Sequence, residues 1–300
     1  MQKVLVTGAN GFIGGHVCEW LKKRGYFVIG LGRRKFAEKD MNDYISCDLG
    51  ADDLNKKILS HIDQKIDVVV HLAADMRKEP HTVEVVRANC TGTEKLLELC
   101  ENNNIDTFIQ LSSLPVIGKP IEHPITESHP LNPPTVYHVT KRTQELLANY
   151  AYNKFGLRTV SFRISAPVGI GMNSKTIFPV FVQNALNNND IVLAGEGLRK
   201  QTYVHVDDIS QAIEKAINSN VQGVYNLASY NYLSNFELAQ MCIEVLKSNS
   251  KIIYSGQDDP MDSYFWDVSL DKIMKDLGYE PQITIETAIK EMGEYLEETL

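Results

Sequence analysis

The sequence predicts an α/β protein built on a doubly wound parallel sheet. Short apolar runs with the character of buried strands alternate with amphipathic stretches of helical spacing. The first apolar run leads directly into a glycine-rich turn that opens a helix. The 300 residues are 43% hydrophobic, which is enough for one large core or for two closely packed domains. These observations favour a Rossmann-type sheet with a smaller mixed α/β region after it.

The expected elements follow one another along the chain. In the first half, strands are expected at 4–6, 26–31, around Ile45, 68–70, 108–111 and 159–164, with helices at 15–23, 54–59, 82–100 and 137–155. Strict alternation of this kind implies parallel strands with helices on both faces. After Pro167 the pattern loosens, and we expect strands at 203–206 and 224–226 and helices at 178–186, from about 208, at 234–246, 270–277 and 284–296.

The pattern also suggests how the chain divides. We expect residues 1–165, together with about 201–228, to form the dinucleotide-binding domain. Residues of about 166–200 and 229–300 would form the substrate-binding domain. The boundary near residue 165 is soft, because nothing there resembles a flexible linker.

Composition excludes several classes of function. The net charge is −8 and the only basic run is 33–35, so a nucleic-acid partner is disfavoured. The five cysteines are scattered without a Cys-x-x-Cys pair, so we expect reduced thiols, no metal site and no disulfide framework. No signal peptide opens the chain and no apolar run approaches the length of a membrane span. We therefore expect a cytoplasmic protein without a membrane partner.

The glycine-rich turn at 7–14 has the features of a phosphate-binding loop. Gly8 permits a tight turn, Gly11 lets the backbone approach a pyrophosphate, and Gly14 allows the helix to pack closely on the strand. The helix N-terminus then offers free N–H groups and the positive end of its dipole. We expect this turn to bind a dinucleotide through Gly8, Asn10, Gly11, Phe12, Ile13 and Gly14.

The end of the second strand bears on the choice of cofactor. An NAD-binding unit usually carries an acidic residue there for the ribose 2′-hydroxyl, but this chain has Gly32 followed by Arg33 and Arg34. Because an arginine guanidinium can donate two hydrogen bonds to a 2′-phosphate, the sequence favours NADP and leaves NAD open. The alternative is that both arginines are solvated loop charges. Asp48 could reach the adenine amine, or it could cap a helix that begins before Ala51.

Tyr137 and Lys141 form the pattern Tyr-x-x-x-Lys. A spacing of four places both side chains on one helical face, and a nearby ammonium favours the phenolate. Such a pair suits a proton shuttle, although a surface Tyr and Lys would be the ordinary explanation of the pattern alone. Ser113 after the fifth strand and Asn89 on the long helix make chance a poor explanation.

Together these motifs resemble the extended short-chain dehydrogenase/reductase family, also called the NAD-dependent epimerase/dehydratase family. The matching segments are TGANGFIG at 7–14, CDL at 47–49, HLAA at 71–74, NCTGT at 89–93, LSS at 111–113, YHVTK at 137–141 and YVHVDD at 203–208. The resemblance implies that Ser113 hydrogen-bonds the reacting oxygen and that Tyr137 exchanges its proton. It implies that Lys141 binds the nicotinamide ribose and tunes Tyr137.

The resemblance assigns further residues to the cofactor and substrate. Asn89 would order the active-site backbone, and Pro167 and Val168 would lie against the nicotinamide. The remaining expected cofactor contacts are Asp48, Leu49, Leu72, Ala73 and Ala74, and the expected substrate contacts are Ser113, Phe178, Arg199 and Tyr203.

Departures from the family pattern narrow the chemistry. Family 4,6-dehydratases carry Asp-Glu directly after the serine or threonine, and the epimerising reductases of deoxysugar synthesis place a reactive Cys there. In this chain Leu114 and Pro115 follow Ser113, so hydride transfer at an alcohol or ketone carbon is what remains. In the resembled family the usual substrate is a nucleotide-diphosphate sugar that reacts at carbon 4.

The residues expected to clamp the diphosphate also depart from the pattern. Many family members use two arginines, and our alignment places Gln201 and roughly Gln257 at their positions. Arg199 and Lys200 are close enough to substitute, or they are charges on a solvated strand edge. His205 is expected to be structural rather than catalytic.

Three functions remain open. The leading prediction is an NADP-dependent 4-ketoreductase. The second is a nucleotide-sugar 4-epimerase, of the UDP-hexose or UDP-N-acetylhexosamine type, with tightly bound NAD. The third is a non-catalytic NADP-binding regulatory protein. A homodimer is also expected, because the helices at 82–100 and 137–155 are apolar on more than one face and are the ones that the resembled family pairs into a four-helix bundle.

Overall fold

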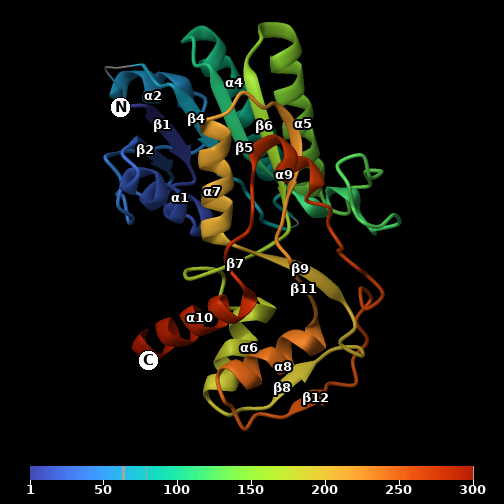
Figure 1. The fold of residues 1–300 in the computed structure, drawn as a ribbon. Coiled ribbons are helices and arrows are strands. Elements are labelled where there is room, and N and C mark those ends of the chain that lie inside the picture. Colours follow the sequence, from blue (N-terminus) through green and yellow to red (C-terminus); the bar gives the residue numbers. More distant parts are fainter. Residues whose placement is uncertain (63–64, 79, 300) are drawn as a thin grey trace.

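Seven parallel strands form the central sheet in a computed structural model that describes residues 1–62, 65–78 and 80–299 (Figure 1). Their order across the sheet is β10-β6-β5-β4-β1-β2-β3. The strands are β1 Lys3–Thr7, β2 Phe27–Gly32, β3 Asp43–Ser46, β4 Val68–His71, β5 Thr107–Ser113, β6 Arg158–Ile164 and β10 Gly223–Leu227. The crossovers between successive strands contain helices, as the alternating pattern predicted, except that β2 and β3 are joined by residues 33–42 without a helix.

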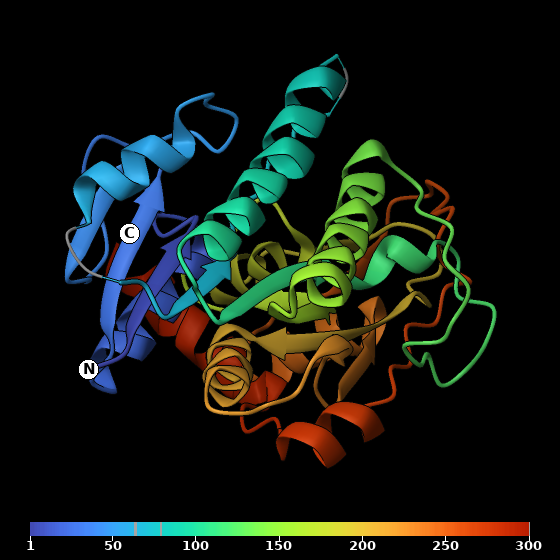
Figure 2. The ribbon, with the colours of Figure 1, turned by 90° about the horizontal axis from the view of Figure 1, so that it is seen from above.

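Helices cover both faces of this sheet, which confirms the doubly wound prediction. Helices α1 (Phe12–Lys23) and α7 (Val206–Ile217) pack on one face. Helices α2 (Leu54–His61), α4 (Gly92–Asn102) and α5 (Val136–Phe155) pack on the other. Figure 2 shows α4 and α5 standing side by side on that face. The carboxyl ends of the strands consequently meet at one edge of the sheet, where ligands bind in this fold class.

The long helix expected at 82–100 is interrupted by a wider turn. It consists of α3 (Thr82–Val86), a π-helical turn η1 (Arg87–Thr91) and α4. The apolar spacing that predicted one regular helix does not reveal the extra residue of a π-helical turn. Such turns inside α-helices occur frequently at functional sites, and this one contains Asn89.

A second lobe lies below the central sheet in Figure 1. It contains a three-stranded sheet in the order β11-β9-β7 and a two-stranded sheet of β12 and β8. Its strands are β7 Ala166–Val168, β8 Ile191–Leu193, β9 Lys200–His205, β11 Asn231–Ser234 and β12 Ile252–Tyr254, and its helices are α6 Ile177–Leu186, α8 Asn235–Val245 and α10 Ile285–Thr299. These helices enclose a separate apolar core.

Two later elements return to the central sheet. Strand β10 pairs with β6, and α9 (Asp271–Leu277) packs against β10 and α7. Strand β9, which the sequence assigned to the dinucleotide-binding part, is hydrogen-bonded to β7 and β11 in the second lobe. The division into a cofactor-binding and a substrate-binding domain stays a proposal.

Two helices begin earlier than the sequence predicted, and in each case the capping geometry explains it. Helix α1 starts at Phe12, because the carbonyl of Gly11 already accepts from the amide of Gly15. Helix α7 starts at Val206, because the ring of His205 accepts a hydrogen bond from the Asp207 amide. Within residues 1–62, 65–78 and 80–299, none of the helices has the length and apolar character needed to span a membrane.

Candidate active site

The glycine-rich turn is held too tightly for larger residues. Gly8 has a φ of +74°, and a Cβ built on it would lie 2.8 Å from the amide nitrogen of Ala73. A Cβ on Gly14 would overlap the carbonyl of Gly8. The backbone therefore passes close to the end of β4, and α1 packs closely against the turn.

The N-terminus of α1 has the properties of an anion-binding site. Its N-cap is Gly11, which has no side chain to accept a hydrogen bond from the first turn. Phe12 and Ile13 therefore keep the donors that a pyrophosphate requires. The cradle of small residues and the uncapped helix end fit the dinucleotide expected here.

The side chain of Asn10 holds the loop that follows β2. Its Nδ2 donates to the carbonyl of Phe36 at 2.9 Å and to the hydroxyl of Tyr44 at 3.1 Å. Its Oδ1 accepts from the amide of Glu38 at 2.9 Å. Asn10 thus joins the glycine-rich turn to residues 33–38, which border the expected ribose site.

The two arginines after β2 lie in different surroundings. Arg34 forms an ion pair with Glu38, so its charge is already compensated. Arg33 is exposed and forms no ion pair with any residue in the described part of the chain. Nearby, the carboxylate of Asp48 accepts from the amide of Gly50 at 2.7 Å. It does not cap α2, whose N-cap residue is Asp53.

The loop after β4 contains the expected contacts Leu72, Ala73 and Ala74. The amides of Leu72 and Ala73 each donate to Oγ1 of Thr7 at 3.2 Å, which holds this loop beside the glycine-rich turn. Leu49 is buried and packs against Gly92. Pro167 and Val168 lie in β7, where Val168 is buried in the core of the second lobe.

Tyr137 and Lys141 lie one turn apart near the start of α5. Thr135 caps this helix through its Oγ1, which accepts from the amide of His138. Nζ of Lys141 lies 5.9 Å from the centre of the Tyr137 ring and donates to the carbonyl of Leu111 at 2.7 Å. Lys141 is therefore held between the phenol and the strand that ends at Ser113.

Electrostatics at this pair differ from the sequence expectation in one respect. Burial raises the pKa of Tyr137 to about 12 and lowers the pKa of Lys141 to about 8. The sequence predicted that the lysine would lower the pKa of the phenol. In this state the desolvation of a phenolate outweighs the attraction of the nearby ammonium.

Ser113 is the last residue of β5 and is only half-buried. A short 3₁₀ turn, η2 (Leu114–Ile117), follows it directly and packs against α5. The parallel sheet thus brings the end of β5 to the start of α5. Leu114 in this turn is buried among apolar residues, so the position directly after Ser113 provides no acid or base.

Asn89 links three segments of the site from its place in the π-helical turn. Its Nδ2 donates to the carbonyl of Asp75 and to Oγ1 of Thr140, both at 2.9 Å. Its Oδ1 accepts from the amide of Asp75 at 2.7 Å. Thr140 in turn donates to the carbonyl of Tyr137 at 2.7 Å. Asn89 therefore orders the backbone around the tyrosine.

The expected substrate contacts are not gathered in one place. Phe178 and Tyr203 are each about 1% exposed and lie 6.4 Å apart, ring centre to ring centre, in the core of the second lobe. Arg199 is half-buried, and its guanidinium donates to Oε1 of Gln201 at 3.3 Å. Its Nε is buried and finds no acceptor among the residues that the structure describes.

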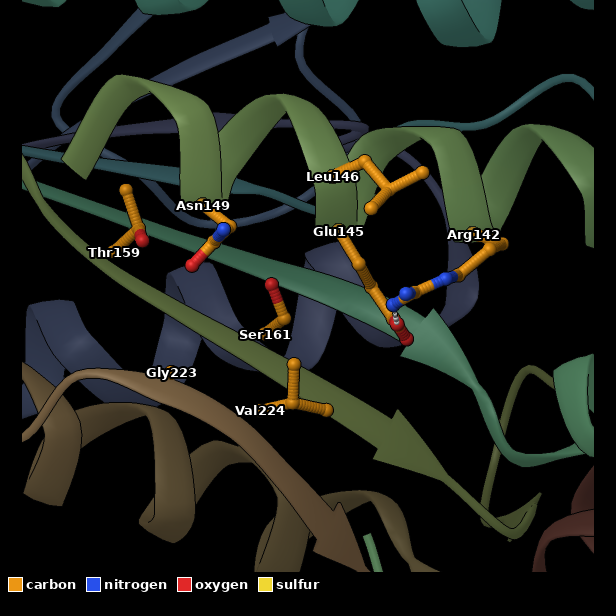
Figure 3. Close-up of a pocket in the computed structure, with 8 residues that line it drawn as sticks. All are labelled: Arg142, Glu145, Leu146, Asn149, Thr159, Ser161, Gly223 and Val224. Carbon is orange, nitrogen blue, oxygen red and sulfur yellow. Dashed lines mark hydrogen bonds and ion pairs between the residues drawn. The ribbon is translucent and has the colours of Figure 1, made fainter. Parts of the chain in front are cut away.

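Sequence reasoning missed a buried ionic cluster beside Tyr137 and Lys141. Glu145, one turn after Lys141, forms ion pairs with Arg163 and Arg142 and accepts from Oγ of Ser112 at 2.6 Å. Figure 3 shows Arg142 reaching Glu145 at the rim of a hollow of about 250 Å³ between α5 and the edge of the sheet. The signal available in the sequence was an acidic residue four positions after the lysine. None of the expected site residues lines this hollow.

Comparison with known proteins agrees with this geometry. The model of the NAD dependent epimerase/dehydratase family matches residues 4–228. A putative UDP-glucose 4-epimerase of Methanocaldococcus jannaschii is 26% identical, with 98% of each chain covered.

Solved structures share the fold. A UDP-glucose 4-epimerase of Thermotoga maritima, determined with UDP-glucose, superposes with a TM-score of 0.90 at 22% identity over 99% of each chain. A UDP-glucuronic acid 4-epimerase of Bacillus cereus, in complex with UDP-glucuronic acid and NAD, superposes with a TM-score of 0.86 at 23% identity over 100% of each chain. At these identities the structural likeness establishes the fold alone.

Proposed function

Because this chain belongs to the NAD-dependent epimerase/dehydratase family, we propose that it is an enzyme that transfers a hydride at carbon 4 of a nucleotide-diphosphate sugar. The observation that carries the proposal is the half-buried phenol of Tyr137 beside the buried ammonium of Lys141 at the end of β5. The apolar turn after Ser113 supports bare hydride transfer rather than dehydration, since it has no second acid or base.

In the proposed reaction Tyr137 accepts the proton of the 4-hydroxyl as carbon 4 becomes a ketone, and later returns it. Ser113 donates a hydrogen bond to the same oxygen, and Lys141 holds the cofactor ribose and favours the phenolate. The cofactor, when bound, supplies the hydride acceptor and, in its oxidised form, a positive charge that also favours the phenolate. Its pyrophosphate would be held by the amides of Phe12 and Ile13 at the start of α1.

We favour net 4-epimerisation. In that reaction the ketone turns within the site before hydride and proton return to its other face, so no cofactor is consumed. The M. jannaschii relative, similar over almost the whole chain, is described as a putative UDP-glucose 4-epimerase, and the B. cereus neighbour holds NAD. We therefore propose NAD as the resident cofactor. The second candidate is an NADP-dependent 4-ketoreductase, favoured by the uncompensated charge of Arg33.

The substrate proposal has support of its own in Arg199. No carboxylate in the described part of the chain pairs with this half-buried guanidinium, and its Nε lacks an acceptor. A partly desolvated cation without a counter-ion raises the free energy of the folded protein, and a bound anion would offset that cost. The diphosphate of a nucleotide sugar would supply that anion.

We also propose a homodimer through α3 and α5. These two helices carry several exposed apolar side chains, among them Val83, Val86, Val139, Leu146 and Tyr150. The two helices pack against each other, so their apolar residues can contribute to one surface. Apolar side chains exposed on neighbouring helices are typical of an interface between copies.

One experiment distinguishes the candidate functions. The purified protein is denatured, and the released nucleotide is identified by mass spectrometry. The native protein is then incubated with UDP-glucose, UDP-N-acetylglucosamine and UDP-glucuronic acid without added cofactor. Released NAD and interconversion of the 4-epimers support the epimerase. Oxidation of added NADPH in the presence of a 4-keto sugar nucleotide supports the ketoreductase, and cofactor binding without turnover of any sugar contradicts both.

A further inference from the structure

A chain of buried polar side chains runs from the glycine-rich turn into the interior. Oγ1 of Thr7, the last residue of β1, lies 2.7 Å from Nδ1 of His71 at the end of β4. Nε2 of His71 lies 3.0 Å from Oγ1 of Thr93 on α4. All three residues are fully buried, and burial lowers the pKa of His71 to about 3, so the ring is neutral at physiological pH.

The chain meets the catalytic helix at Gln144, one turn after Lys141. Nε2 of this buried side chain donates to Oγ1 of Thr93 at 2.7 Å and to the carbonyl of Asn89 at 3.0 Å. Thr93 itself donates to the same carbonyl at 2.6 Å. The carbonyl of Asn89 lies in the π-helical turn.

Counting donors and acceptors fixes the direction of the chain. Thr93 gives its single hydroxyl hydrogen to the carbonyl of Asn89, so it accepts from His71 and the imidazole proton resides on Nε2. Nδ1 of His71 therefore accepts from the hydroxyl of Thr7. The 3.1 Å approach of Nε2 of Gln144 to Nε2 of His71 is a contact between two donors, because both amide hydrogens are already used.

Both ends of this chain reach groups that the proposed reaction needs. At one end, Oγ1 of Thr7 accepts from the amides of Leu72 and Ala73, which border the expected cofactor site. At the other end, the side chain of Asn89 bonds Thr140, and Thr140 bonds the carbonyl of Tyr137. Loss of any link leaves a buried donor or acceptor unsatisfied, which is costly.

We propose that Gln144 and His71 are positioning residues that couple the cofactor-binding turn to the catalytic helix. The consequence for turnover rests on the proposed role of Tyr137, whereas the consequence for cofactor affinity does not. Gln144 does not touch the cofactor in this proposal. It acts by holding Thr93 and Asn89, and through His71 it holds Thr7 and the loop after β4.

The main test compares two buried glutamines. Gln144→Met keeps the approximate shape of the side chain and removes both donors. Gln110→Met is the matched control, because Gln110 is equally buried and its amide bonds Ser161 outside this chain. Binding of NADH, followed by fluorescence, should weaken on the order of 10-fold in Gln144→Met, the worth of one or two lost hydrogen bonds. It should change less than 2-fold in Gln110→Met.

A second pair of variants tests the chain without Gln144. Thr93→Val removes the hydroxyl at constant shape and should weaken NADH binding, whereas Thr93→Ser keeps the hydroxyl and should restore it. The double variant of Thr7→Val with Gln144→Met should weaken binding less than the product of the single effects, because both break the same chain. The same changes in NADH affinity should occur when each variant is combined with Tyr137→Phe, because the binding measurement does not depend on turnover.

Several outcomes would overturn the proposal. One is unchanged NADH affinity in Gln144→Met and in Thr93→Val. Another is equal loss in Gln144→Met and Gln110→Met, which would indicate general core damage. Simple multiplication of the Thr7 and Gln144 effects would show that the two ends are independent. If the affinity shifts occur but no sugar nucleotide is turned over, the coupling stands and the proposed reaction fails.

Discussion

Lys141 donates a hydrogen bond of 2.7 Å from its ammonium to the carbonyl of Leu111, and this contact joins α5 to the strand that carries Ser113. The bond places a buried positive charge within one helical turn of Tyr137. The proposed acid, the proposed charge and the proposed substrate hydrogen bond therefore depend on one interface between β5 and α5.

The phenol of Tyr137 is expected to dominate turnover. Tyr137→Phe should lower kcat by about 10²–10⁴-fold, the usual contribution of a positioned acid or base, and should leave cofactor binding intact. Ser113→Ala should cost less, because one hydrogen bond of several is lost. Lys141→Met should also weaken cofactor binding. Steady-state kinetics and NADH titration measure these effects. If the Tyr137→Phe variant turned over at the wild-type rate, Tyr137 would be an ordinary surface residue of the helix without a catalytic role.

The buried ammonium of Lys141 should make stability depend on pH. Its pKa is about 8 in the folded protein and 10.5 in the unfolded chain, so the unfolded state binds more protons between these values. The contribution of Lys141 to the free energy of unfolding should rise with pH in this window, by about 1.4 kcal/mol per pH unit at most. Lys141→Met should lack this rise. The buried thiols of Cys18, Cys100 and Cys242, whose pKa values burial raises from 9.0, contribute a fall in the upper part of the window in both proteins, so the difference between them isolates Lys141. Urea unfolding between pH 8 and 10 measures it, and equal slopes in the two proteins would contradict the buried charge.

The comparison is confined below pH 10 because of Tyr137. Its pKa is raised from 10 to about 12, so the folded state binds more protons above pH 10 and stability falls there as pH rises. The two residues thus act in opposite directions in adjacent windows. The Tyr137→Phe variant should lose the part of the fall above pH 10 that Tyr137 contributes and keep the part due to other tyrosines with raised pKa values, such as Tyr203 and Tyr279.

Arg199 is expected to recognise the anionic part of the substrate. Arg199→Gln should raise KM for the sugar nucleotide on the order of 10-fold with a smaller change in kcat, since a charge-assisted contact is lost in both ground and transition states. Lys200→Gln is the matched control, because Lys200, the first residue of β9, lies 3.7 Å from Glu237 and its charge is therefore already paired. Equal changes in KM for the two variants would show that Arg199 is a solvated surface charge and not a substrate contact.

Cofactor choice should depend on Arg33 and not on Arg34. Arg33→Ala should weaken NADPH binding by about 10-fold and leave NADH binding unchanged if this guanidinium meets a 2′-phosphate. Arg34→Ala is the control, since that guanidinium already pairs with Glu38. An acidic residue at Gly32 is a poorer probe, because its Cβ would lie 2.9 Å from the hydroxyl of Tyr44. No change in NADPH affinity would identify Arg33 as a solvated charge.

The proposed dimer depends on the exposed apolar side chains of α3 and α5. Leu146 is 51% exposed, so Leu146→Glu should cost little in the monomer and should strongly disfavour the interface by burying a charge there. Tyr254→Glu is the control, because Tyr254 is 56% exposed on β12 in the other lobe. Light scattering at micromolar concentration should show a dimer for the wild type and the control and a monomer for Leu146→Glu. A monomeric wild type would refute the proposal.

Local patterns in the sequence determined much of this protein. The glycine spacing at 7–14 and the strand before it predicted the turn, because a tight turn and a close backbone approach require glycine at those positions. The alternation of apolar runs predicted the parallel sheet, and the spacing of Tyr137 and Lys141 predicted their shared helical face. Each of these features depends on residues that are close along the chain.

Only the tertiary structure decided the features that depend on distant residues and on burial. His71 and Gln144 meet across 73 positions, and no local pattern marks either as part of one chain of hydrogen bonds. The π-helical turn at Asn89 and the pairing of β9 with β7 arise from contacts outside the local sequence. The raised pKa of Tyr137 has the same origin, because desolvation depends on what surrounds the phenol in space and not on the lysine four residues away.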